Sequence, residues 1–289
     1  HGWSNLQSLH INLPFANDEE FGRLHAAIRL ILPILPALAA SSPIVDGRVT
    51  DVLDSRLEAY RDNCARIPCV SGRVIPEPLF SIGAYHERIL AQIYAALRPF
   101  DPEGVLCHEW VNARGAIARF ERNSIEIRVL DVQECPAADL AIASTVTTVL
   151  KQLVNDTWSD LAAQQAWSCE PLVKILDNTT RHAEAAMIGN RNYLRALGWP
   201  KPGGCTAGQL WRHLIDAAAA HDAETMAPHR AALNVILSQG TLARRILAAV
   251  GEPDAPQLRD RLHATYGELC ACLATGRLFE PATACKPAM

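Results

Sequence analysis

The stretch Ser124-Ile-Glu-Ile-Arg-Val-Leu-Asp131 decides the fold class of this sequence. Its apolar residues at positions 125, 127 and 129 share one face, while Glu126 and Arg128 share the other. A period of two is typical of a β-strand with one buried face. The sequence therefore predicts a strand over residues 124–131 that carries an acid and a guanidinium side by side.

Two further segments show the same alternation. In residues 8–13 the polar face carries His10 and Asn12. Residues 105–114 also alternate, and one face would carry His108, Trp110, Asn112 and Arg114. The sequence thus predicts strands over 8–13 and 105–114, with residues 115–123 connecting the second to the strand at 124–131 through a turn at 121–123.

Most of the remaining chain has helical spacing. A helix is expected from the N-cap candidate Asn17 to residue 35, with a kink at Pro33, which lacks an amide donor. Residues 67–78 carry three prolines and are expected to form a loop. Further helices are expected after the N-cap candidate Thr206 and over 52–65, 81–97, 136–155, 228–238, 241–250 and 256–273, before an irregular tail of about a dozen residues.

This layout defines an α+β fold, with strands and helices mixed in the front half and an alanine-rich helical back half. We expect residues 1–157 to form a sheet-containing core. Residues 158–289 are expected to form a helical segment of the same domain.

Composition limits the function classes. The 289 residues carry a net charge of −4 and a pI near 6.2, which argues against a nucleic-acid-binding protein. The longest uncharged apolar run, residues 30–40, contains two prolines and is too short to span a bilayer. No secretory leader follows His1. The nine cysteines include no C-x-x-C pair, so free thiols in a reducing cytoplasm are expected.

The strongest chemical signal is the pair Glu126 and Arg128. A glutamate can hold a hard cation such as Mg²⁺, and an arginine beside it can bind a phosphate oxygen. The alternative is an ion pair on a solvated sheet face. His10 could complete a metal site, or it could be a satisfied, partly buried histidine.

The other arginines could have either of two roles. Arg56 could bind a carboxylate substrate or lie on a solvated helix face. Arg114, Arg119 and Arg122 surround Gly115 between two predicted strands, where they could cradle a nucleotide phosphate or line an exposed hairpin. The P-loop, dinucleotide-binding and nucleophile-elbow fingerprints are absent from the sequence.

Taken in order, several segments resemble the glutamate–cysteine ligase family, in its bacterial carboxylate–amine ligase branch. The segment Gln7-Ser-Leu-His-Ile-Asn-Leu13 resembles the family's histidine-bearing strand. The helix end at Ser42-Pro43 is similar to the branch's "ALSA-SP" stretch, and residues 124–131 are similar to its "EVR–D" strand. Residues 47–61 and 109–120 are also similar to branch members, so the resemblance covers residues 5–157 well and the back half more loosely.

The resemblance implies a glutamine-synthetase-like antiparallel sheet that forms a substrate funnel. It also implies an ATP-dependent ligase of the cytoplasm, in which the γ-carboxylate of glutamate is phosphorylated and the amine of cysteine or a related amine attacks the acyl phosphate. The partners implied are these small molecules, with Mg²⁺ as cofactor and neither nucleic acid nor membrane. Cations suit this reaction because ATP and a carboxylate repel each other.

Residue by residue, the resemblance makes His10 and Glu126 metal ligands and Arg128 the arginine near the transferring phosphate. It makes Arg56 a binder of a substrate carboxylate, and Arg114 is a further candidate for substrate binding. The family's opening strand of clustered glutamates has no counterpart here. We therefore expect an N-terminally incomplete ligase core that is inactive alone, or a non-catalytic relative that binds nucleotide or amino acid. A third alternative is that the helices of residues 158–289 form an interaction module.

Overall fold

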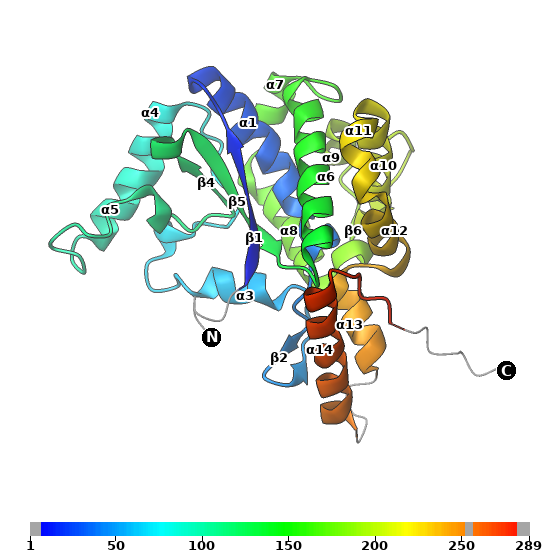
Figure 1. The fold of residues 1–289 in the computed structure, drawn as a ribbon. Helices are drawn as coiled ribbons and strands as arrows, with labels where there is room; N and C mark the ends of the chain where they lie inside the picture. Colours follow the sequence, from blue (N-terminus) through cyan, green and yellow to red (C-terminus); the bar gives the residue numbers. More distant parts are fainter. Residues whose placement is uncertain (1–6, 252–256, 282–289) are drawn as a thin grey trace.

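Helices dominate the fold, and they pack around small antiparallel sheets (Figure 1). The computed structural model describes residues 7–251 and 257–281. This architecture confirms the predicted α+β class. The expected tail after residue 281 lies outside the described residues.

A three-stranded antiparallel sheet carries the predicted strands. It consists of β1 (Ser8–Pro14), β4 (Ala116–Arg119) and β5 (Ser124–Asp131), in the order β1-β5-β4. Glu126 on the middle strand lies opposite Asn12 of β1 and Ile117 of β4. The β1–β5 register shifts between Leu9 and Ile11, so that the single residue His10 faces two residues of β5. This bulge re-aims side chains near the middle of the sheet.

The strand predicted over residues 105–114 is wrong. That segment forms turns and a short 3₁₀ helix, η5 (Glu109–Val111), and the strand lies later, at β4. The reason is local: the Asp101 carboxylate accepts hydrogen bonds from the amides of Val105 and Leu106. These bonds hold the chain in turns, which a residue pattern of period two does not reveal. The expected turn before β5 is present as η6 (Phe120–Arg122).

The first predicted helix is confirmed as α1 (Asp18–Ile31), with Asn17 accepting a hydrogen bond from the amide of Glu20. The α-helix gives way to the 3₁₀ helix η2 (Leu32–Ile34), which contains Pro33, and then to α2 (Pro36–Ala39). The break therefore falls at the predicted proline.

Each helix predicted from residue 52 onward is present, with shifts of a few residues at its ends. The helix predicted at 81–97 contains a π-helical turn, η4, in its middle. The remaining elements are β2 (Ile44–Val45), β3 (Arg48–Val49), α3 (Ser55–Asp62), η3 (Pro68–Val70), α4 (Ile82–Tyr85), η4 (His86–Leu90), α5 (Ala91–Leu97), α6 (Pro136–Val154), α7 (Leu161–Gln165), α8 (Cys169–His182), η7 (Ala183–Ala185), β6 (Met187–Ile188), α9 (Arg191–Ala196), β7 (Cys205–Thr206), α10 (Ala207–His221), α11 (Ala223–Met226), η8 (Ala227–His229), α12 (Arg230–Gln239), α13 (Leu242–Val250) and α14 (Leu258–Thr275). The short strands β2, β3, β6 and β7 and the helices α7, α8, α9 and α11 were not predicted.

One hydrophobic core joins the two halves of the chain. It extends from Ile11 on β1 through α1, η2 and α6 to Ile236 on α12. A second, smaller core lies between α13 and α14, which project together from the body (Figure 1). The division at residue 157 stays a prediction, because the main core includes residues on both sides of it.

Within the described part, α6 is the one helix long and apolar enough to cross a membrane by length and composition. Its most apolar window is 56% buried, and it contacts α1, α10 and α12. These contacts are those of a core helix. The eight cysteines of the described part are free thiols, as expected.

Candidate functional site

Four polar side chains, those of His10, Arg119, Glu126 and Arg128, meet on the polar face of the three-stranded sheet. Glu126 Oε1 lies 3.0 Å from Nδ1 of His10 and 2.8 Å from Nε of Arg128. Its other oxygen accepts a hydrogen bond from Nη1 of Arg119 at 3.0 Å. The cluster therefore brings β1, β4 and β5 together around one buried carboxylate.

The electrostatics of this cluster favour the ionised glutamate. Burial alone would raise the pKa of the Glu126 carboxyl, but hydrogen bonds from His10 and Arg128 hold it well below its usual range. The Nε2 atom of His10 also lies 2.9 Å from the Ser8 hydroxyl. Both ring nitrogens of His10 and both oxygens of Glu126 thus have protein partners.

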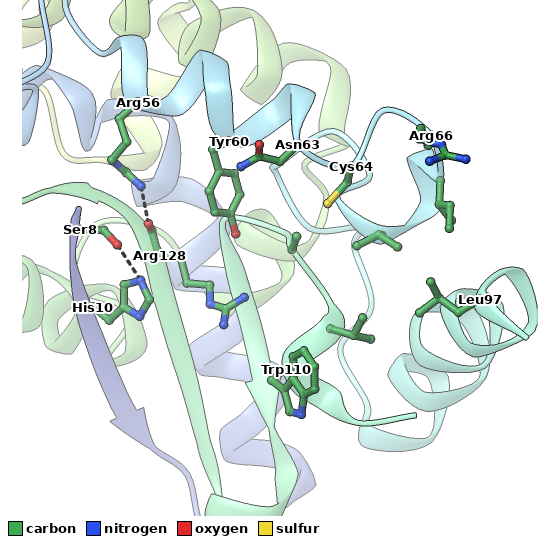
Figure 2. A pocket seen from close by; sticks show the side chains of 14 residues that line it. Ser8, His10, Arg56, Tyr60, Asn63, Cys64, Arg66, Leu97, Trp110 and Arg128 are labelled. Atoms are coloured by element: carbon green, nitrogen blue, oxygen red, sulfur yellow. Dashed lines mark hydrogen bonds between the residues drawn. The ribbon is translucent and has the colours of Figure 1, made fainter. Parts of the chain in front are cut away.

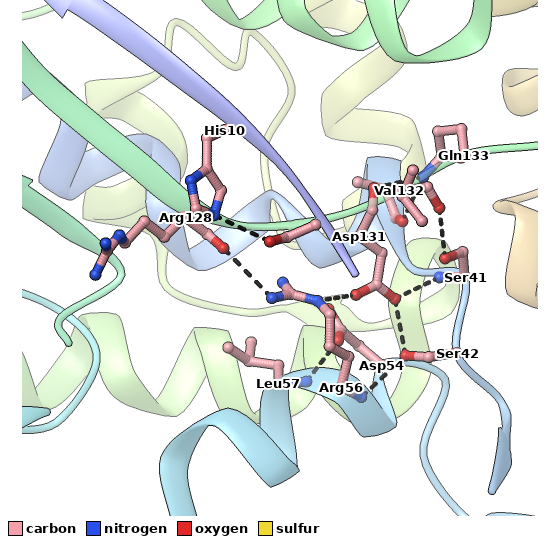
Figure 3. Close-up of polar contacts among 12 residues, drawn as sticks. His10, Ser41, Ser42, Asp54, Arg56, Leu57, Arg128, Asp131, Val132 and Gln133 are labelled. Carbon is pink, nitrogen blue, oxygen red and sulfur yellow. Dashed lines mark hydrogen bonds and ion pairs between the residues drawn. The ribbon is translucent and has the colours of Figure 1, made fainter. Parts of the chain in front are cut away.

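Arg56 belongs to a neighbouring network under the sheet (Figure 3). Its Nε donates to the buried carboxylate of Asp131, and its Nη1 lies 3.4 Å from the carbonyl oxygen of Arg128. Asp131 also accepts hydrogen bonds from the amide of Ser41 and the hydroxyl of Ser42. The Ser-Pro helix end noted in the sequence therefore anchors the aspartate that holds Arg56.

A third carboxyl group, that of Asp54, is completely buried beside this pair. Burial raises the pKa of Asp54 well above its usual range, and the nearby Asp131 raises it further. One oxygen of Asp54 caps α3 by accepting from the amide of Leu57 at 2.9 Å. The raised pKa favours the neutral form of Asp54, and Asp131 is the carboxylate that forms the ion pair with Arg56.

A pocket of about 530 Å³ opens beside these networks, within the size range of small-molecule sites (Figure 2). His10, Arg56 and Arg128 line it together, and Tyr60 of α3 stands between the two arginines. The structure thus brings three predicted site residues to one cavity. Glu126 does not line the pocket itself, but its carboxylate contacts His10 and Arg128, which do.

Arg114 lies apart from the other candidates. Its guanidinium forms a two-point pair with Glu77, with distances of 2.5 and 2.7 Å, and also donates to the carbonyl of Cys69 and the side chain of Asn112. Burial lowers and Glu77 raises the pKa of Arg114, which is raised on balance. Arg114 does not line the pocket, so its donors support the loop at residues 69–77.

The residues present do not form a metal cage as they stand. The described part contains no group of three or more His, Cys, Asp or Glu side chains able to hold a metal ion. Mg²⁺ prefers oxygen ligands, and Glu126 offers one carboxylate that already accepts from two arginines. A cation at Glu126 would also lie next to Arg119 and Arg128. The arrangement fits an anion better than a bare metal ion.

Sequence reasoning gave no site role to Tyr60, Trp110 or Asp131. Tyr60 is buried on the inner face of α3, its hydroxyl donating to the Arg114 carbonyl at 3.2 Å. Trp110 lies on the 3₁₀ helix η5, where the sequence pattern predicts a strand. The role of Asp131 could have been predicted in part, because an aspartate that is buried at the end of a strand needs a cationic partner. In the structure that partner is Arg56.

These features define an α+β protein with a cationic small-molecule pocket at the end of a three-stranded sheet. The model of glutamate-cysteine ligase family 2 matches residues 1–264. The chain belongs to this family, which confirms the resemblance inferred from its sequence.

Two curated relatives are similar to the chain. An "Uncharacterized protein" of Archaeoglobus fulgidus is 42% identical over 206 residues, covering 68% of this chain and 55% of the relative. A protein of Nocardioides sp. named "Putative glutamate--cysteine ligase 2-1" is 29% identical over 166 residues, covering 57% of this chain and 39% of the relative. The chain thus matches about half, or less, of the length of these relatives.

Proposed function

We propose that this chain is part of an ATP-dependent ligase that joins the γ-carboxylate of glutamate to the amine of cysteine or a related amine. The observation that carries the proposal is the contact of Glu126 with His10 and Arg128, two residues that line the pocket, in a family 2 chain. Arg56 lines the same pocket, so two guanidinium groups are available for anionic substrates.

The proposed reaction has two steps. The γ-carboxylate of glutamate takes the terminal phosphoryl group of ATP and releases ADP. The amine nitrogen then attacks the acyl carbon, a C–N bond forms, and phosphate leaves with the electron pair of the broken C–O bond, while the nitrogen gives a proton to solvent. Each step brings anions together or moves negative charge, which positively charged side chains stabilise.

Roles follow from position and charge. Arg128 lies at the pocket wall with its Nε held by Glu126, so we assign it to the transferring phosphoryl group. Arg56, fixed by Asp131, is assigned to a substrate carboxylate. His10 and Glu126 orient Arg128. Mg²⁺ is proposed to accompany ATP, and the family resemblance makes His10 and Glu126 its candidate ligands. Both side chains already have protein partners, so neither offers a free ligand atom as it stands.

The test is ADP release from Mg²⁺–ATP with glutamate and cysteine present, measured for the 289-residue chain and for a longer protein that contains it. We expect the longer protein to release ADP only when both amino acids are present, and the 289-residue chain alone to be inactive. Arg128→Lys keeps the charge but loses the planar fork, so it is expected to lower the rate by about 100-fold. The matched control is Arg98→Gln, an exposed arginine outside the pocket.

A second candidate is a non-catalytic relative that binds nucleotide or amino acid. The observation in its favour is that the described residues hold no cluster of metal-binding side chains. Titration calorimetry with Mg²⁺–ATP and with each amino acid separates the two candidates. Binding without ADP release favours the non-catalytic relative. Cytoplasmic location is part of both proposals.

A further inference from the structure

The pocket has two chemically different ends. His10, Arg56 and Arg128 lie at one end, with the Ser8 hydroxyl. The other end has an apolar wall formed by Ile67, Val70, Leu97, Trp110 and Val111. Figure 2 shows Leu97 and Trp110 on the far side of Arg128 from His10. The proposed reaction uses the polar end only, and the apolar wall has no part in it.

Trp110 is held in place although its ring is exposed. The tryptophan is 45% exposed, whereas Glu109 before it and Asn112 after it are buried. Glu109 accepts from the amide of Glu121, and Asn112 donates to the hydroxyl of Tyr85 at 2.8 Å. The amide of Ala113 donates to the carbonyl of Val70, which ties the segment to the opposite wall. A rigidly presented, exposed aromatic ring is typical of a binding surface.

The side chains that line the pocket include arginines but no acids, since no aspartate or glutamate is among them. Arg66 lies at the far end, beyond the apolar wall in Figure 2, and it is exposed. Arg66 forms no ion pair within the residues that the structure describes. An acidic group that reaches this end of the pocket would therefore find a free guanidinium.

We propose that the amine joined at this site has an apolar, aromatic body with an acidic group at its far end. The inference rests on the proposed function, because the ligase reaction places the amine nitrogen at the polar end. From there the body of the molecule would lie against Trp110 and Leu97, and its acid would reach Arg66. Cysteine is too short to cover the apolar wall, which would stay in contact with water.

The preference for an aromatic amine over cysteine can be estimated. A single methylene group in an apolar pocket changes specificity by about 10- to 200-fold. An aromatic ring covers more surface than one methylene, so we expect at least about a tenfold preference over cysteine. The acid should add to this preference only when it is separated from the amine by the ring.

The experiment compares three amines as co-substrates in ADP release: 4-(aminomethyl)benzoate, 2-phenylethylamine and cysteine. We expect kcat/KM to decrease in that order. Trp110→Ala is expected to reduce the ratio of 4-(aminomethyl)benzoate to cysteine at least tenfold, and its control is Phe100→Ala, an exposed aromatic outside the pocket. Arg66→Gln should bring 4-(aminomethyl)benzoate down to the level of 2-phenylethylamine, with Arg98→Gln as control.

The outcomes separate this proposal from the proposed function. Turnover that prefers cysteine, with Trp110→Ala lowering all three amines equally, overturns the proposal and leaves the ligase function intact. If no amine supports ADP release by the longer protein, the ligase function fails, and calorimetry with 4-(aminomethyl)benzoate then tests whether the pocket binds an aromatic acid. Binding that Trp110→Ala weakens at least tenfold supports the proposed occupant, and absence of binding overturns it.

Discussion

The imidazole Nδ1 of His10 on β1 lies 3.0 Å from Oε1 of Glu126 on β5, which follows β1 late in the chain but lies beside it in the sheet. The antiparallel pairing of β1 with β5 creates this contact. The same carboxylate accepts from Arg128 and Arg119, so it is the centre of the polar network at the pocket wall.

Replacing Glu126 by Gln tests the role of this carboxylate in stability and in ADP release. The variant leaves two partly buried guanidinium groups without their anion, so we expect a loss of about 3 kcal/mol in the free energy of unfolding. Released from Glu126, Arg128 is also expected to lose its position, and ADP release should fall by at least about tenfold. Urea unfolding and the coupled ADP assay measure these effects. Glu121→Gln is the control, since Glu121 is exposed. An unchanged rate would show that the role given to Glu126 is wrong.

Strong local patterns predicted much of this site. The alternation at residues 124–131 placed Glu126 and Arg128 on one face, and the spacing of residues 8–13 placed His10 on the polar face of its strand. Both strands exist, and they pair with each other. Local alternation is informative when one face is buried, as it is for Ile125 and Ile127.

Contacts between distant segments could not be predicted. The partner of Arg56 is Asp131 and that of Arg114 is Glu77, and both pairings depend on how loops and helices pack onto the sheet. The false strand at 105–114 has the same origin, because Asp101 and the Val70 carbonyl determine its turns. Trp110 was thus given a strand position, while in the structure it lines the pocket from a 3₁₀ helix.

The two buried aspartates near Arg56 should respond differently to the same substitution. Because the raised pKa of Asp54 favours its neutral form, Asp54→Asn should change the buried charge less than Asp131→Asn does, and asparagine also caps a helix well. We expect it to cost less than about 1 kcal/mol. Asp131→Asn instead leaves the buried Arg56 guanidinium without an anion and should cost about 3 kcal/mol or more. Urea unfolding of both variants at pH 7 measures the difference. Equal losses would contradict the preference of Asp54 for its neutral form.

His25 predicts a pH dependence of stability. This fully buried histidine stacks on Phe21, and desolvation, helped by the charge of Arg29, lowers its pKa from 6.5 to about 3. Between these values the unfolded chain binds a proton that the folded chain does not, so stability falls as the pH falls. From pH 7 to pH 5 this one group should remove about 2 kcal/mol.

The matching variant is His25→Phe, which keeps an aromatic ring against Phe21 and removes the titrating nitrogens. We expect this variant to lose about 2 kcal/mol less than the original protein between pH 7 and pH 5. The control is His221→Gln, at an exposed position on α10. Urea unfolding at the two pH values gives the comparison. A variant with the same pH dependence as the parent would mean that other groups produce it.

A buried pair far from the pocket fixes the end of the described chain. Arg245 of α13 donates to Glu134 at 2.5 Å, and the backbone of Phe279 contacts both: its carbonyl accepts from Arg245 and its amide donates to Glu134. Both side chains are almost fully buried. Removing one partner leaves a buried charge, so Glu134→Gln should cost about 3–5 kcal/mol and expose the segment around Phe279 to protease.

The double variant Arg245→Met with Glu134→Leu separates the charge from the packing. Replacing a whole buried ion pair by apolar residues is often neutral or stabilising, so this variant should be at least as stable as the parent within about 1 kcal/mol. Its backbone at Phe279 has nevertheless lost two partners, and we expect faster cleavage there by a protease of broad specificity than in the parent. Unfolding free energies and limited proteolysis followed by mass spectrometry distinguish the two effects. If cleavage near Phe279 were as slow in the double variant as in the parent, α13 and α14 would hold this segment by packing alone.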